Sequence, residues 1–225
     1  MIDKKYCIEQ SNIINSIYNK YKSEYDRLNE NAEELTSYFQ YSKGGDVVQD
    51  GYYCPSLGID LALSNANRGK LYKKITTKTR PSYCYQFNKE NNLIKATHLK
   101  SDKNSLSHTF VVHDGETEIR LMFVQRQKSQ KLEFCLEGIG LCYFENGTLM
   151  SYAYACICGL LLNGKLKFIF EHEFYTYENG HLSKCDVYQL GFSVSQMALD
   201  VANKRPSLSF NFDVDENGQL FLIKP

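Results

Sequence analysis

The chain has no tryptophan, only four prolines among its 225 residues, and no long run of apolar residues. Its longest apolar stretch, residues 152–162, falls far short of the roughly 20 residues that a membrane-spanning helix needs. No proline- or serine-rich linker divides the chain, so we expect a single domain over residues 1–225. The first residues contain no apolar core of a secretory signal, which predicts a cytoplasmic protein without membrane attachment.

Motifs for several kinds of chemistry are also missing. The chain has no Gly-x-Ser-x-Gly nucleophile elbow, no phosphate-binding loop and no dinucleotide-binding fingerprint. It has no Cys-x-x-Cys pair, and the closest approach to a zinc motif is Cys156-x-Cys158. This pair lies in an apolar run that predicts a buried strand, so we interpret both thiols as core residues. We expect no cofactor and no metal, and we expect the eight cysteines to be reduced.

The residues that are abundant favour strands. The chain contains 17 tyrosines and 13 phenylalanines, whose flat rings pack well across a pleated sheet. Five Asn-Gly or Asp-Gly pairs stand between β-rich runs, and these pairs are the strongest local signal of a tight hairpin. They are Asp114-Gly115, Asn146-Gly147, Asn163-Gly164, Asn179-Gly180 and Asn217-Gly218. The runs beside the turns predict strands at residues 82–87, 93–99, 107–113, 116–124, 132–136, 140–144 and 219–223.

The N-terminal part of the chain has a different period. Apolar residues from Ile14 to Leu28 recur at steps of three and four, which predicts a helix. A second helix, or a continuation, is predicted over residues 32–41, and Gly44-Gly45 ends it. We therefore expect an α+β, mainly β fold. Helices in residues 1–44 pack on a large antiparallel meander sheet of hairpins in residues 45–225. Residues 57–63 predict a buried strand, and residues 195–203 predict a short helix.

Charge is unevenly distributed along a chain whose formal net charge is zero. Residues 68–103 carry 10 bases and 2 acids, whereas both flanking parts are acidic. Five bases stand within 11 residues that contain no acid: Lys70, Lys73, Lys74, Lys78 and Arg80.

Three interpretations of this basic segment remain open. With the interleaved Tyr72, Tyr83 and Tyr85 it could bind nucleic acid by neutralising phosphates and stacking on bases. The neutral charge of the whole chain makes nucleic acid an unlikely partner. The segment could instead dock on an acidic protein surface. It could also be a solvated edge strand whose lysines block unwanted pairing.

Acidic groups form the other candidate sites. Glu171 and Glu173 flank a histidine, and alternation along a strand places both carboxylates on one face. Such a pair could act as acid and base or bind a cation, but a solvent-facing pair is the simpler interpretation. A third acidic group is formed by Asp213, Asp215 and Glu216.

Several segments resemble the β-rich immunity proteins that accompany bacterial polymorphic toxins. They are Arg68-Gly-Lys-Leu71, Tyr83-Cys-Tyr-Gln-Phe87, and hairpins of the form aromatic-Glu-Asn-Gly-x-Leu at residues 144–149 and 177–182. The resemblance covers residues 68–223. It implies a protein, related to antitoxins, that binds and blocks one cognate toxin and performs no chemistry.

The leading hypothesis is therefore a non-enzymatic binding protein, an immunity-type toxin inhibitor. A nuclease toxin would require an acidic patch, either Asp213, Asp215 and Glu216 or Glu171 and Glu173, whereas an acidic partner would require residues 68–80. The alternatives are a small hydrolase that uses Glu171 and Glu173, and a nucleic-acid-binding protein that uses the basic segment.

Overall fold

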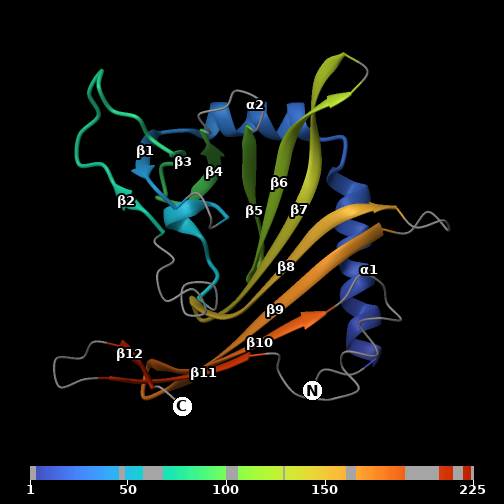
Figure 1. Ribbon diagram of the computed structural model, residues 1–225, viewed down its shortest axis with the longest axis vertical. Coiled ribbons are helices and arrows are strands. Elements are labelled where there is room, and N and C mark those ends of the chain that lie inside the picture. The colour runs from blue at the N-terminus through green and yellow to red at the C-terminus, as the bar shows by residue number, and fades with distance from the viewer. Residues whose placement is uncertain are drawn as a thin grey trace.

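A computed structural model describes residues 4–45, 49–57, 68–99, 106–128, 130–160, 166–190, 208–214 and 220–223. Within these residues the chain begins with two helices, α1 (Lys4–Tyr21) and α2 (Tyr25–Leu35), and then consists mainly of strands (Figure 1). A short 3-10 helix, η1 (Gly51–Tyr53), interrupts the early strands. The strands are β1 (Tyr38–Lys43), β2 (Lys70–Leu71), β3 (Tyr83–Phe87), β4 (Leu93–His98), β5 (Ser107–Asp114), β6 (Thr117–Lys128), β7 (Lys131–Glu145), β8 (Thr148–Leu160), β9 (Leu166–Glu178), β10 (His181–Leu190), β11 (Leu208–Val214) and β12 (Leu220–Ile223).

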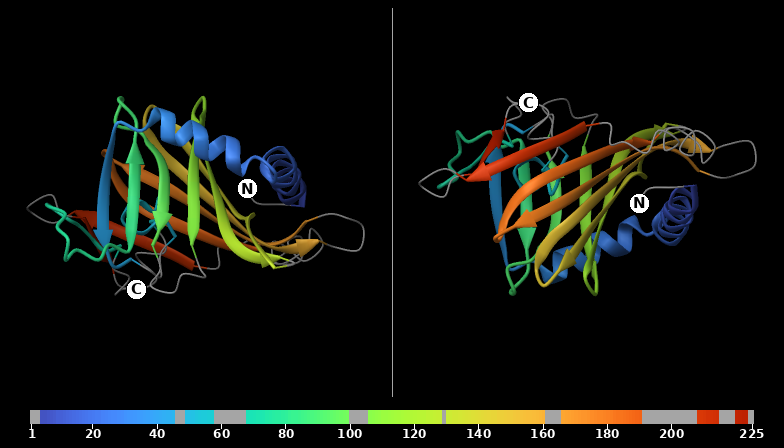
Figure 2. Two further views of the ribbon diagram at one scale, coloured as in Figure 1. Left: turned by 90° about the horizontal axis from the view of Figure 1, so that it is seen from above. Right: turned by 90° about the horizontal axis from the view of Figure 1, so that it is seen from below.

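The described strands form one antiparallel sheet of twelve strands. From β3 to β12 each strand pairs with the next strand in the chain, and β1 lies between β2 and β3. Short connections place consecutive strands side by side in this way. The prediction of a mainly β protein with a large antiparallel sheet is confirmed. Figure 2 shows that the sheet is strongly twisted and curved, as expected for so many strands.

The tight turns follow from their residues. Asn146 and Gly147 have φ of 50° and 79°, and Asn179 and Gly180 have φ of 51° and 80°. Positive φ at both central residues is the requirement of a type I′ turn, which matches the twist of the paired strands. The predicted turns at Asn163-Gly164 and Asn217-Gly218 lie outside the described residues.

The predicted helical segment at residues 1–44 is wrong at its C-terminal end. Helix α2 ends at Leu35, and β1 pairs along its length with β3, with Gln40 opposite Tyr85. The aromatic residues of β1 fit a helical period as well as an alternating one. Pairing with a neighbouring strand, which is invisible in a local pattern, decides between the two.

The two strands predicted at residues 132–136 and 140–144 are one strand, β7. Its pairing with β6 shifts between Leu136 and Gly138, so a β-bulge at residue 137 replaces the expected break. Of the other predicted elements, residues 58–63 and 195–203 lie outside the described residues, and Leu57 lies in a bend rather than a strand.

The two faces of the sheet bury different partners. On one face a core that includes Phe110, Phe123 and Phe170 packs with Ile14 and Tyr21 of α1 and with residues of α2. On the opposite face lie aromatic and small residues of β3, β7, β8 and β10, together with Tyr53 and Leu57 of the segment formed by residues 49–57. We call these the helix face and the segment face.

Two tyrosine–histidine pairs link the helices to the helix face. The Tyr25 hydroxyl of α2 is hydrogen-bonded to Nδ1 of His108 in β5 at 2.7 Å, and the Tyr6 hydroxyl of α1 is hydrogen-bonded to Nδ1 of His172 in β9. The Tyr25 ring also stacks on Phe134, with ring centroids 4.0 Å apart. Burial lowers the pKa of both histidines to about 3, so both are neutral near pH 7.

These histidines predict a loss of stability in mild acid. Their pKa is lower in the folded protein than the ordinary value of about 6.5, so only the unfolded chain takes up their protons as the pH falls. The free energy of unfolding should therefore decrease by about 1.4 kcal/mol per histidine for each pH unit below about 6.5, until the folded pKa is reached. Urea denaturation at pH 7 and at pH 5 measures this slope.

Replacement of the buried histidines provides the comparison. His108→Gln and His172→Gln should each lower the stability at pH 7 but flatten its dependence on pH. His181→Gln is the matched control, because His181 is exposed on β10. An unchanged pH dependence in both buried variants would show that these histidines do not cause the loss of stability in acid.

Candidate functional site

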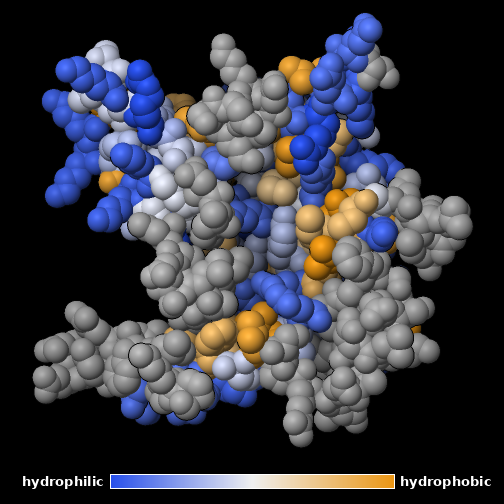
Figure 3. Space-filling model, viewed as in Figure 1, coloured by the Kyte–Doolittle hydropathy of each residue, from blue (hydrophilic) through white to orange (hydrophobic). Residues whose placement is uncertain are grey.

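The basic segment predicted from the sequence is an exposed loop at one end of the sheet. Lys70 begins the edge strand β2, and the other four bases follow in the loop that leads to β3; all five side chains are exposed. Figure 3 shows hydrophilic side chains projecting at the upper left, where Figure 1 draws β2 and this loop. Among the described residues, none of Lys70, Lys73, Lys74 and Lys78 forms an ion pair.

Internal hydrogen bonds give the basic loop a defined shape. The Thr79 backbone N–H donates to the Thr76 carbonyl at 3.0 Å, and the Thr76 N–H donates to the Thr79 hydroxyl at 2.8 Å. The Tyr72 hydroxyl donates to the Arg80 carbonyl at 3.1 Å and closes the base of the loop. Ile75 stands among the bases with 45% of its surface exposed. A loop ordered in advance loses less entropy on binding than a flexible one.

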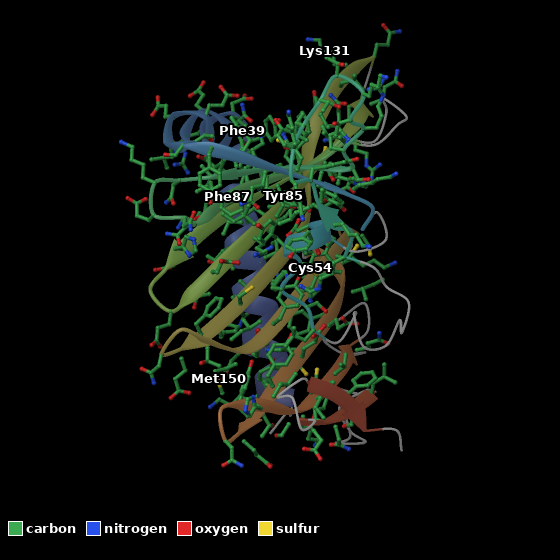
Figure 4. The ribbon with its side chains drawn as sticks, turned by 90° about the vertical axis from the view of Figure 1, so that its left-hand side faces the viewer. Phe39, Cys54, Tyr85, Phe87, Lys131 and Met150 are labelled. Carbon is green, nitrogen blue, oxygen red and sulfur yellow. The ribbon has the colours of Figure 1, made fainter. Side chains whose placement is uncertain are left out.

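The tyrosines interleaved with these bases do not form a stacking surface. Tyr83 is 3% exposed and Tyr85 is fully buried. The Tyr83 ring stacks on His98 at 4.4 Å between centroids, and the Tyr85 hydroxyl is hydrogen-bonded to Ser42 and to the backbone of the 49–57 segment. Tyr85 and Phe87 of β3 belong to one buried cluster and are labelled in Figure 4. The interpretation of Tyr83 and Tyr85 as base-stacking residues is therefore wrong.

The start of the basic loop is attached to the 49–57 segment. The Arg68 guanidinium donates to the carbonyl oxygens of Cys54 and Ser56. Gly69 has φ of +87°, and a Cβ at this position would clash with the Lys43 carbonyl oxygen. A glycine is required here because two backbone segments cross at contact distance.

A buried ion-pair network attaches the 49–57 segment to the sheet. Arg120 Nη1 of β6 donates to Asp50 Oδ2 and to the Tyr53 carbonyl, both at 2.9 Å, and its Nε donates to Glu118 Oε1 at 2.7 Å. Burial lowers the pKa of Arg120, but the carboxylates of Glu118 and Asp50 outweigh it and hold that pKa above its ordinary value. The guanidinium is thus a permanent buried charge satisfied by two elements at once.

Glu173 forms a second attachment point, and its predicted exposure to solvent is wrong. Its side chain is fully buried; it accepts hydrogen bonds from the hydroxyls of Ser56 and of Tyr175, the latter at 2.6 Å. Alternation along β9 does place Glu171 and Glu173 on one face, as expected. This is the segment face, and the 49–57 segment covers Glu173 there. A serine hydroxyl bonded to a carboxylate can support nucleophilic chemistry, but Ser56 is also fully buried.

The other predicted acidic residues lie away from the basic loop. Glu171 is half-buried and accepts a hydrogen bond from Gln189 Nε2 at 2.9 Å. Asp213 is exposed on β11, near the sheet edge opposite β2. Asp215 and Glu216 lie outside the described residues. Among the described residues, the five bases thus lie together in one loop, and Asp213 lies near the opposite edge of the sheet.

An open depression of about 540 Å³ lies at the turn between β7 and β8. It is lined by Glu145, Asn146, Thr148, Met150, Tyr175, Thr176 and Tyr177. Met150 marks this position at the bottom of Figure 4, far from Phe39 and Lys131. The depression is remote from the basic loop, and of the predicted site residues it contains none.

Sequence reasoning missed Asp50, Ser56 and Arg120, which hold the segment in place. One signal was present: Arg120 interrupts an apolar strand between Ile119 and Leu121 on the face opposite to those residues. A cation at a position that should be buried indicates a buried counter-charge. The local pattern does not show which carboxylate supplies that counter-charge.

The described part of the chain contains no group of three or more His, Cys, Asp or Glu side chains arranged for a metal ion. No described helix is sufficiently long and apolar to cross a membrane. Comparison with protein families, curated proteins and solved structures finds no match in any of the three.

The Arg120 network predicts a large and specific loss of stability. Arg120→Leu leaves the Asp50 and Glu118 carboxylates buried without their cation, which should lower the free energy of unfolding by about 3–5 kcal/mol. Arg126→Leu is the matched control on the same strand, because its ion pair with Glu137 is half-exposed and should contribute less than about 1 kcal/mol. Guanidinium denaturation of both variants measures the difference, and equal losses would contradict this account.

Proposed function

We propose that this protein is a non-enzymatic binding module whose basic loop docks on an acidic surface of a partner protein. The observation that carries this proposal is the ordered, exposed loop of residues 70–80, which presents bases without intramolecular counter-charges among the described residues. Unpaired cations on a preformed loop accelerate encounter with an acidic partner and align it.

The partner class we propose is a bacterial toxin that the protein blocks as an immunity protein in the cytoplasm. This rests on the resemblance of residues 68–223 to β-rich immunity proteins. An inhibitor of this kind needs a rigid surface and no chemistry of its own. In this proposal the N-terminal helices cover one face of the sheet. The sheet in turn holds the basic loop in a constant position.

A protein partner is favoured over nucleic acid by the side chains around the bases. Tyr83 and Tyr85 are buried and unable to stack on nucleobases, and the whole chain carries no net positive charge. The exposed apolar side chain in the loop is that of Ile75, which suits a protein surface better than a phosphate backbone.

A hydrolase that uses Glu171 and Glu173 receives less support. Glu173 and Ser56 are fully buried and bonded to one another, so a substrate would have to displace the 49–57 segment to reach them. Their hydrogen bond instead attaches that segment to the sheet.

Charge reversal in the loop tests the proposal. The triple variant Lys73→Glu, Lys74→Glu, Lys78→Glu should reduce capture of a stoichiometric protein partner from the source organism at least tenfold, because it repels an acidic surface. The matched control reverses Lys128 and Lys131, which are exposed at the β6–β7 turn, and should leave capture unchanged. Affinity purification with quantitative mass spectrometry measures capture.

The dependence of binding on salt distinguishes the electrostatic contacts of the lysines from the apolar contact of Ile75. Binding to the intact loop should weaken as salt rises, because exposed charges are screened over about 8 Å at 0.15 M ionic strength. Ile75→Ser should weaken binding without altering the salt dependence. Capture that disappears after nuclease treatment would instead assign the loop to nucleic acid, and equal loss in the control variant would remove the loop from the interface.

A further inference from the structure

A β-bulge lies near the end of β8, at Cys158. In the pairing of β8 with β9, Ile157 lies opposite Phe168 and Gly159 lies opposite Lys167, so Cys158 has no residue directly opposite. Gly159 has φ of +131°, a conformation that glycine adopts readily, and open space surrounds the position where its Cβ would stand. A bulge bends its strand and reorients the extra side chain.

This geometry brings two thiols together at the surface. Cys158 is exposed, Cys156 is half-buried, and Cys158 Sγ lies 3.5 Å from the Cys156 carbonyl oxygen. The two side chains also form a hydrogen bond with one another. The interpretation of both residues as buried core cysteines is therefore wrong, because Cys158 is exposed and Cys156 is only half-buried.

A methionine lies across Gly138 from Cys156. Gly138 of β7 pairs with Met122 on one side and with Cys156 on the other. Because Gly138 has no side chain, the Tyr154 hydroxyl and the methyl end of Met122 both lie over it, the methyl 3.0 Å from the position that a Cβ would occupy. The thioether thus belongs to the same cross-strand row as Cys156.

We propose that Cys156 and Cys158 bind one Cu(I) ion as a two-coordinate thiolate site. Each thiol loses a proton to the solvent as its sulfur bonds to the ion, so that two thiols and one Cu(I) give a singly negative complex and two protons. No electron is transferred.

The ligand set selects Cu(I) over other common ions. Thiolate sulfurs are soft ligands, which favour Cu(I), and two ligands satisfy this ion. Zinc requires four ligands, usually all from the protein in a structural site, and the described residues supply no third His, Cys, Asp or Glu to this pair. Hard oxygen-preferring cations find no suitable partner in these sulfurs.

Competition with a chromogenic Cu(I) chelator tests the proposal on the full, reduced protein without oxygen. One equivalent of Cu(I) should bind, and Cys156→Ser and Cys158→Ser should each weaken binding at least 100-fold. Binding should also weaken as the pH falls, because protons compete for both sulfurs. Cys135→Ser is the matched control: this thiol is half-buried on the neighbouring strand β7, and its loss should leave the affinity unchanged.

X-ray absorption of the loaded protein should show two sulfur neighbours around copper, and Met122→Leu should leave that number unchanged. Several outcomes would overturn the site. One is equal affinity in the wild type and in the two cysteine variants. Another is a preference for Zn(II) when both ions are offered. A third is a thiol pair that stays oxidised, with a mass lower by two hydrogens and no copper bound.

Discussion

The guanidinium of Arg120 lies where the sheet and the 49–57 segment meet, and the arrangement of the segment face depends on it. An arginine does not lose its charge at any ordinary pH, so its burial is tolerated only if carboxylates surround it. Glu118 supplies one from the same strand, and Asp50 supplies the other from the segment. The segment is thereby held against the sheet at one point, and the hydrogen bond between Ser56 and Glu173 holds it at a second point.

The same attachment extends to the surface. Arg68 donates hydrogen bonds to the carbonyl oxygens of Cys54 and Ser56, so the chain just before the basic loop is attached to a segment that the sheet already holds. The close backbone crossing at Gly69 continues this chain of contacts to the exposed bases. The loop can be both solvent-exposed and ordered because its base rests on buried charges. On the helix face the corresponding links are neutral, since Tyr6 and Tyr25 meet histidines whose pKa burial has lowered.

Most of the strands could be predicted because their signals are local. A turn such as Asn179-Gly180 requires positive φ at both residues, and few other pairs adopt it at low cost. The end of α2 and the start of β1 could not be predicted, because Tyr38 and Phe39 fit both a helical and an extended pattern. Pairing of β1 with β3, more than forty residues later in the chain, resolves that ambiguity. Glu173 and Cys158 were placed wrongly for a related reason: alternation assigns a face, but it does not show what covers that face.

The sequence by itself determined the hairpin-rich, mainly antiparallel sheet, the helical start and the position of the basic segment. These follow from turn geometry, side-chain period and charge counting, which act over a few residues. Only the tertiary structure decided which polar residues are buried and which are available to a partner. Asp50 and Arg120 are seventy residues apart in the chain, and only the packing of the 49–57 segment on the sheet brings them together. Burial is a property of everything that surrounds a side chain, so it cannot be read from the neighbours of that residue in the sequence.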